Sequence, residues 1–197
     1  MAQSHDMFVG QCHGYEIMRD TTFYSEPSIT PAKLAEITGV SPDTQRDWRR
    51  RGVFEGLGTL QPNGRWLYDS FDVLIICVMR ELAASNVELF AARRISTLIT
   101  SRVVVWAIHE KGIMSAAGAC RFSVAYPDDA APAGWQVETL FHVNMLNNTP
   151  DRGAACLLID LQSMGRALPA YFDDLLKPIA TRIKEKADQR EEGEVDG

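Results

Sequence analysis

Residues 29–54 read ITPAKLAEITGVSPDTQRDWRRRGVF, and this stretch determines the predicted fold. Thr30 and Ser41 each precede a proline, the arrangement of an N-cap residue followed by a first helical residue that needs no N–H partner. Gly39 stands where a helix C-cap adopts a positive φ, and Gly52 follows the second helical stretch. Because so few residues separate the first stop from the second start, the sequence predicts two short helices joined by a tight turn, a helix-turn-helix.

The residues after this helix pair carry signals for a hairpin and then for two further helices. The Pro-Asn-Gly tripeptide at 62–64 contains Asn-Gly, which favours a tight turn with positive φ at both positions. Asp69 and Asp72 have the spacing of a capping box that opens a helix, and Asn86 ends that helix. Another helix is predicted over about 87–101. The predicted order is therefore helix, turn, helix, hairpin, helix, helix.

Residues from about 28 to 100 resemble the winged helix-turn-helix DNA-binding domain of MerR-like transcriptional regulators. The resemblance depends on a combination of positions in the right order, because no single position is specific. These positions are Ala35, Gly39, Val40, Ser41, Thr44, Arg46, Trp48, Arg51, Gly52, Tyr68 at the end of the wing, Asp72 and Val73. The resemblance implies that helix 42–51 enters the major groove and that the wing, residues 53–68, lies on the DNA backbone.

Side chains on this second helix and on the wing suit contacts to duplex DNA. Thr44 and Gln45 can reach bases or phosphates, and Arg46 can form a forked contact to a guanine edge or a phosphate. Arg49 and Arg50, one turn later, suit phosphates. With the wing residues that the resemblance implies, the predicted DNA-binding residues are Ser41, Thr44, Gln45, Arg46, Arg49, Arg50, Arg65 and Tyr68. This hypothesis requires guanidinium groups that are not neutralised by the chain's own carboxylates.

Three positions depart from the family pattern. Gln45 stands where members usually have Leu, Ile or Val, and Trp66 stands near a common wing arginine. Asp47 stands where many members have a phosphate-contacting Tyr or Phe, and a carboxylate facing DNA lowers affinity by like-charge repulsion. Trp48 is predicted in the core because its spacing from Val40 places it on the buried side of the helix.

The second half of the chain predicts a small antiparallel sheet followed by a helix. Residues 103–108 are β-branched and lack a heptad, so the long dimerising helix usual in MerR-like regulators is not evident, and a strand or a short buried helix remains open. Apolar and polar residues alternate over 120–126, 135–145 and 157–161, which predicts three strands with one buried face. A final helix is predicted from Pro169, with one apolar stripe that contains Phe172, Leu176, Ile179 and Ile183.

These predictions give an α+β fold in which a MerR-like winged helix-turn-helix precedes a small antiparallel sheet with a C-terminal helix. We expect an N-terminal tail over 1–27, the DNA-binding domain over 28–101, and a dimerisation or sensor domain over 102–197.

Charge and composition narrow the function classes. The net charge is −6, yet residues 29–102 hold ten Lys and Arg against eight Asp and Glu, so the basic residues gather in the predicted DNA-binding domain. So small an excess predicts weak binding by one domain and a need for a second copy. Four scattered cysteines fit a reducing cytoplasm, and neither a signal peptide nor a bilayer-length apolar run is evident. No catalytic, metal-binding or phosphate-loop motif is recognised, so we predict no enzyme, no cofactor and no metal.

We therefore predict a cytoplasmic, sequence-specific transcriptional regulator that binds double-stranded DNA as a homodimer. An effector or protein partner at the C-terminal domain is left open. Two alternatives also remain: a DNA-binding assembly factor of the phage terminase small subunit or excisionase type, and a protein-interaction adaptor that uses the same winged helix.

Overall fold

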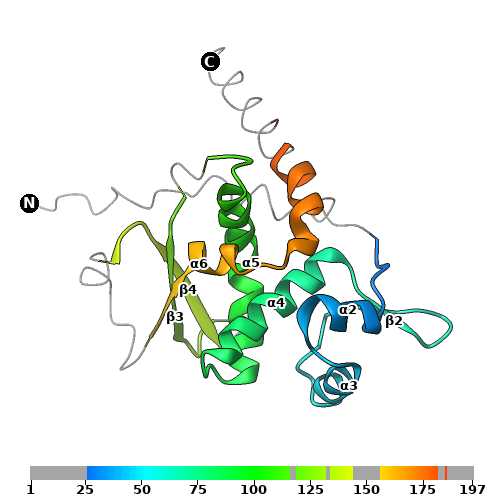
Figure 1. Ribbon diagram of the computed structural model, residues 1–197. Coiled ribbons are helices and arrows are strands. Elements are labelled where there is room, and N and C mark those ends of the chain that lie inside the picture. Colours follow the sequence, from blue (N-terminus) through cyan, green and yellow to red (C-terminus); the bar gives the residue numbers. More distant parts are fainter. Residues whose placement is uncertain (1–25, 116–118, 132–133, 144–155, 182–184, 186–197) are drawn as a thin grey trace, which may run out of the picture.

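The computed structural model describes residues 26–115, 119–131, 134–143, 156–181 and 185. Their fold is α+β, as predicted: long helices lie at the centre, with the helix-turn-helix and wing on one side and a three-stranded sheet on the other (Figure 1). Nearly all of the predicted tail lies outside the described residues, as do Met145 and Ile183. Within the described ranges, none of the helices combines the length and apolar character needed to cross a membrane.

The predicted helix pair is confirmed as α2 (Pro31–Thr38) and α3 (Pro42–Arg50). The Thr30 hydroxyl accepts a hydrogen bond from the Lys33 N–H at 3.2 Å, and the Ser41 hydroxyl caps α3 in the same way. Gly39 adopts a φ of 73°, which lets the chain leave α2 and turn directly into α3. Capping by side chains adjacent in sequence thus fixes both helix starts.

The wing is a short hairpin of β1 (Thr59–Leu60) and β2 (Trp66–Leu67). Its turn differs from the predicted one: Gly64 has a φ of 77°, and Asn63 does not adopt a positive φ. The Gln61 carbonyl accepts from the Gly64 N–H at 2.9 Å, and the Gln61 N–H donates to Arg65 O at 2.8 Å. This is a three-residue loop, in which Pro62 fixes a negative φ at the start and Gly64 alone supplies the left-handed residue.

Two long helices follow, α4 (Ser70–Ala84) and α5 (Leu89–Glu110). The predicted capping box is confirmed, since the Asp69 side chain accepts from the Asp72 N–H and the Asp72 side chain accepts from the Asp69 N–H. α5 extends well past the predicted end near 101 and includes the segment 103–108, which is therefore helical. Because α5 packs against α4, α6 (Leu161–Arg166) and β4 (Trp135–Leu140), it is apolar on several faces and shows no clear amphipathic period.

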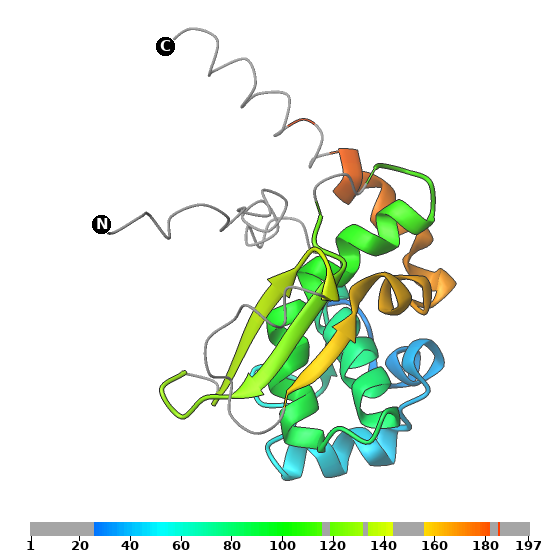
Figure 2. The same ribbon diagram turned by 90° about the vertical axis from the view of Figure 1, so that its left-hand side faces the viewer.

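The predicted antiparallel sheet is confirmed, with β3 (Phe122–Pro127) between β4 and β5 (Leu157–Asp160). Figure 2 shows its strands crossing in front of the central helices. α6 follows β5 directly, because Asp160 accepts hydrogen bonds from the N–H groups of Gln162 and Ser163 and so caps a helix that the sequence did not predict. A 3-10 turn (Ala170–Phe172) and helical residues 173–181 then confirm the predicted C-terminal helix.

The alternation in β3 does not mark the face that packs on the helices. Ala125 pairs with Val137 on one side and with Leu157 on the other, and these three side chains belong to or pack against the main core. The apolar set of β3 that includes Val124 therefore lies on the opposite face of the sheet. The small Ala125 side chain occupies the helix-facing side of the central strand and belongs to the main core.

One hydrophobic core extends from Ile29 to Ala180 and joins the helix-turn-helix to the sheet. The predicted division at residue 101 falls inside α5, which contributes buried side chains on both sides of that position. α6 crosses α5 at Gly165, where a Cβ would lie 2.6 Å from the Ala107 nitrogen. The C-terminal half is thus packed directly onto the helices that support α3 and the wing.

Candidate nucleic-acid interface

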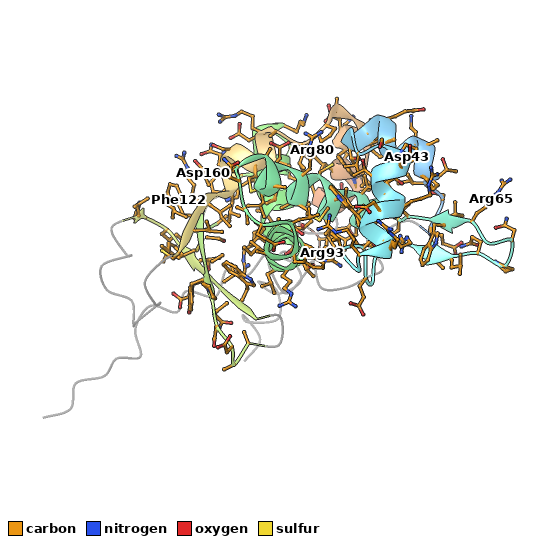
Figure 3. The ribbon with its side chains drawn as sticks, turned by 90° about the horizontal axis from the view of Figure 1, so that it is seen from below. Asp43, Arg65, Arg80, Arg93, Phe122 and Asp160 are labelled. Carbon is orange, nitrogen blue, oxygen red and sulfur yellow. The ribbon has the colours of Figure 1, made fainter. Side chains whose placement is uncertain are left out.

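α3 and the wing border a groove that combines basic and apolar residues. Its volume is about 650 Å³, and it is lined by the starts of α2 and α3 and by residues 64–68 of the wing. Figure 3 shows Arg65 projecting from the far end of the wing, with Asp43 on α3 across from it. The groove is therefore flanked by the two elements that the sequence predicted to contact DNA.

Ser41 and Thr44 form the first turn of α3. The Ser41 hydroxyl accepts from the Thr44 N–H at 3.2 Å and lies 2.9 Å from the Thr44 hydroxyl. Ser41 is exposed and Thr44 is half-buried, and both flank Pro42, which lines the groove. The start of α3 also carries the partial positive charge of a helix N-terminus, which favours a nearby phosphate.

Two arginines of α3 and the arginine at its C-cap are exposed but paired with carboxylates of α3. Arg46 forms an ion pair with Asp43, and Arg50 contacts Asp47 at 2.6 Å between Nη2 and Oδ1. Arg51 lies 3.6 Å from the same aspartate. The hydrogen bond from Arg50 lowers the pKa of Asp47, which therefore stays ionised at neutral pH.

The requirement for unneutralised guanidinium groups is therefore not met at these three positions. The Arg46 and Arg50 side chains are nevertheless 74% and 80% exposed. Exposed ion pairs within one helix are weak because water screens them, so a phosphate can replace a carboxylate as the partner. The aspartates reduce the net positive charge of α3 without burying its arginines.

Gln45 is buried inside the helix-turn-helix rather than presented to solvent. Its Nε2 donates to Pro31 O at 2.9 Å and to Val40 O at 2.8 Å, and the residue is 3% exposed. The amide thereby holds the start of α2 and the turn against α3. In this conformation the side chain is not positioned to contact a duplex, although the sequence placed it among the DNA-binding residues.

Arg49, which is half-buried, and Tyr68, which is buried, border the groove but are engaged within the domain. The Arg49 Cζ lies 3.5 Å from the centroid of the Trp66 ring, and its Nη2 donates to Leu57 O at 3.0 Å and to the Tyr68 hydroxyl at 3.1 Å. Tyr68 is 1% exposed, and its backbone N–H donates to Ile29 O. Both residues therefore join α3 to the wing. Trp48 packs against the core and contacts Phe54 edge-to-face, in agreement with its predicted place.

Arg65 differs from the α3 arginines. It is exposed, and among the described residues it has no ion-pair partner. Its backbone N–H donates to the Asn63 side chain at 3.0 Å, which helps to order the turn. Arg65 thus presents a positive charge at the end of the wing.

Sequence reasoning missed two long-range contacts that support this surface, one made by Asp72 and one by Arg80. The Asp72 Oδ2 accepts from the Gly58 N–H at 3.0 Å, which ties the start of the wing to α4. Burial and the neighbouring Asp69 raise the pKa of Asp72 to about 6. Arg80 on α4 donates to Thr38 O at 2.5 Å and so holds the end of α2. The capping box pointed to Asp72, but no local pattern signalled its contact with Gly58 or that of Arg80 with α2.

Comparison with known families agrees with this architecture. Residues 29–97, about a third of the chain, match the family described as MerR HTH family regulatory protein. This confirms the resemblance, and the matched segment is a MerR-like helix-turn-helix domain of a family of regulators. Among curated proteins, none matches the chain.

Proposed function

We propose that the chain is a cytoplasmic transcriptional regulator that binds double-stranded DNA, with α3 in the major groove and the wing on the backbone. Ser41, Thr44, Arg46 and Arg50 on α3 and Arg65 on the wing supply the contacts. The observation that carries this proposal is that Arg46 of α3 and Arg65 of the wing, both exposed, line one groove within a MerR-like domain. Gln45, Arg49 and Tyr68 support the surface from within.

Two copies are proposed to bind together. The basic excess of the domain is small, so one copy neutralises few phosphates and holds DNA weakly. α5 packs against α4, α6 and β4 of its own chain, which leaves only part of its surface, including Phe90, Arg94 and Thr97, open to a second copy. A two-fold pair predicts inverted half-sites about 34–36 Å apart, one helical turn of DNA.

Selection from a random duplex library, followed by anisotropy titration of the selected site, tests the proposal. We expect the double variant Arg46→Ala, Arg50→Ala to bind about 30-fold or more weakly than wild type. Arg166→Ala is the matched control, because Arg166 is an exposed arginine of α6 that pairs with Glu110. If wild type and the double variant bind every duplex equally poorly, the proposal fails.

The ion pairs on α3 favour a second candidate, a protein-interaction adaptor that uses the winged helix without DNA. Asp43 and Asp47 pair with Arg46 and Arg50, the two arginines of α3 that the DNA-binding proposal needs. The two candidates differ in salt dependence: DNA binding weakens measurably as salt rises, because counterions are released from the duplex, although the slope is shallow when few phosphates are contacted. Absence of binding to any selected duplex at about 50 mM salt would support the adaptor.

A further inference from the structure

Arg49 makes a set of contacts unlike those of its neighbours on α3. Its guanidinium stacks on the ring of Trp66 in β2, with 3.5 Å between Cζ and the ring centroid. Nη2 donates to Leu57 O, just before β1, and to the hydroxyl of Tyr68, just after β2. One side chain of α3 therefore contacts both ends of the wing and one of its strands.

The wing needs such support because its hairpin is small. Each strand has two residues, and a hairpin of this size is not stable by itself in water. Asp72 holds the wing at Gly58, and Ile29 pairs with Tyr68, but these contacts join the wing to α4 and to the segment before α2. The Arg49 contacts join it directly to α3.

We propose that Arg49 is a positioning residue that fixes the wing against α3 and thereby sets the separation of Arg46 and Arg65 across the groove. This inference depends on the proposed function, because the separation matters only if both residues contact one duplex. It replaces the phosphate contact that the sequence predicted for Arg49. Both N–H groups of Nη2 are used within the domain, and Trp66 covers one face of the guanidinium; the three N–H groups on Nε and Nη1 of this half-buried side chain are why the tests include a phosphate-contact outcome.

The first test needs no DNA. Amide hydrogen exchange is measured for Gln61 in the wing and for Ile75 in α4, in wild type and in Arg49→Gln. We expect Gln61 to exchange at least about ten-fold faster in the variant while Ile75 is unchanged, because the lost stacking and hydrogen bonds hold only the wing. Arg50→Gln, an exposed arginine of the same helix, should leave both amides unchanged. Equal exchange of Gln61 in wild type and Arg49→Gln would overturn the proposal.

The second test is a double-mutant cycle on DNA affinity, with Arg49→Gln, Trp66→Leu and their combination. A shared positioning role predicts that the double variant binds about as weakly as either single variant and that the salt slope stays at the wild-type value. Trp66→Phe, which keeps an aromatic face for the guanidinium, should recover most of the affinity. Arg46→Gln combined with Trp66→Leu is the control and should be additive.

The outcomes separate the two roles of Arg49. If Arg49→Lys binds like wild type while Arg49→Gln lowers the salt slope by about one, Arg49 is a phosphate contact and the positioning role is refuted. If wild type binds no duplex, the proposed function fails and with it the groove-setting role. Amide exchange then still shows whether Arg49 holds the wing.

Discussion

Gly165→Ala tests the packing of α6 on α5, which joins the C-terminal half to the DNA-binding surface. A Cβ at this position would lie 2.6 Å from the Ala107 nitrogen and 2.9 Å from the Trp106 carbonyl carbon. Ordinary contacts of a Cβ begin near 3.4 Å, so the two helices must separate by several tenths of an ångström or more. Gly165 does not have a positive φ, and the substitution therefore tests contact rather than backbone strain.

The sign of the effect distinguishes this packing from helix propensity. Replacing a helical glycine by alanine normally stabilises by about 0.5–1 kcal/mol, whereas overpacking costs about 1–3 kcal/mol or more. We expect a net loss of about 1–2 kcal/mol, which for a chain of this size lowers Tm by roughly 2–8 °C. Thermal unfolding followed by circular dichroism measures it, with Ser163→Ala on the exposed side of α6 as the control. A Tm at or above the wild-type value would show that α6 does not approach α5 this closely.

Three further predictions concern single side chains near the interface. Folding raises the pKa of Asp72 to about 6, so the native state binds this proton more tightly than the unfolded state does. The free energy of unfolding should therefore fall as pH rises from about 4 to 6. Urea titrations at each pH measure this decline, and Asp72→Asn should remove it. Asp47→Asn should release Arg50 and Arg51 from their shared ion-pair partner, and so raise DNA affinity and steepen the salt slope by up to about one. Anisotropy titrations measure the slope, and a wild-type slope in the variant would contradict this prediction. Gln45→Glu should lower the free energy of unfolding by about 2–4 kcal/mol, because an ionised carboxylate cannot donate to the two carbonyl groups that the amide contacts. Thermal unfolding measures the loss, and an unchanged Tm would mean that these hydrogen bonds are dispensable.

The parts of the fold that sequence predicted are those encoded by neighbouring residues. Thr30 and Ser41 cap their helices through N–H groups three positions later, and Asp69 and Asp72 cap α4 in the same way. The sheet was predicted because alternation is also a local property. These signals need no knowledge of what packs across the molecule.

The parts that sequence missed depend on distant contacts. The β-branched segment 103–108 becomes helical because α5 is enclosed by its own chain, and burial outweighs a weak local preference. On β3, Ala125 and Val124 lie on opposite faces and both are fully buried, so alternation alone could not show which face packs on the helices. Helical spacing likewise placed Arg49 beside Arg50 without revealing that Trp66, many residues later, lies across from it.

The arginines of α3 and its C-cap have different partners, so the number of arginines alone does not give the positive charge available to bind DNA. Each of these four arginines counts as one positive charge, but Arg49 contacts the wing. The other three, Arg46, Arg50 and Arg51, form ion pairs with two aspartates. The charge available to a duplex is therefore smaller than the number of arginines suggests, and the salt dependence of binding should be shallow. Affinity must then depend on how accurately α3 and Arg65 are held relative to each other, since geometry and not total charge sets how many of these few contacts form at once. A steep salt slope in wild type would contradict this reasoning, because it would require more phosphate contacts than the exposed arginines of the groove can supply.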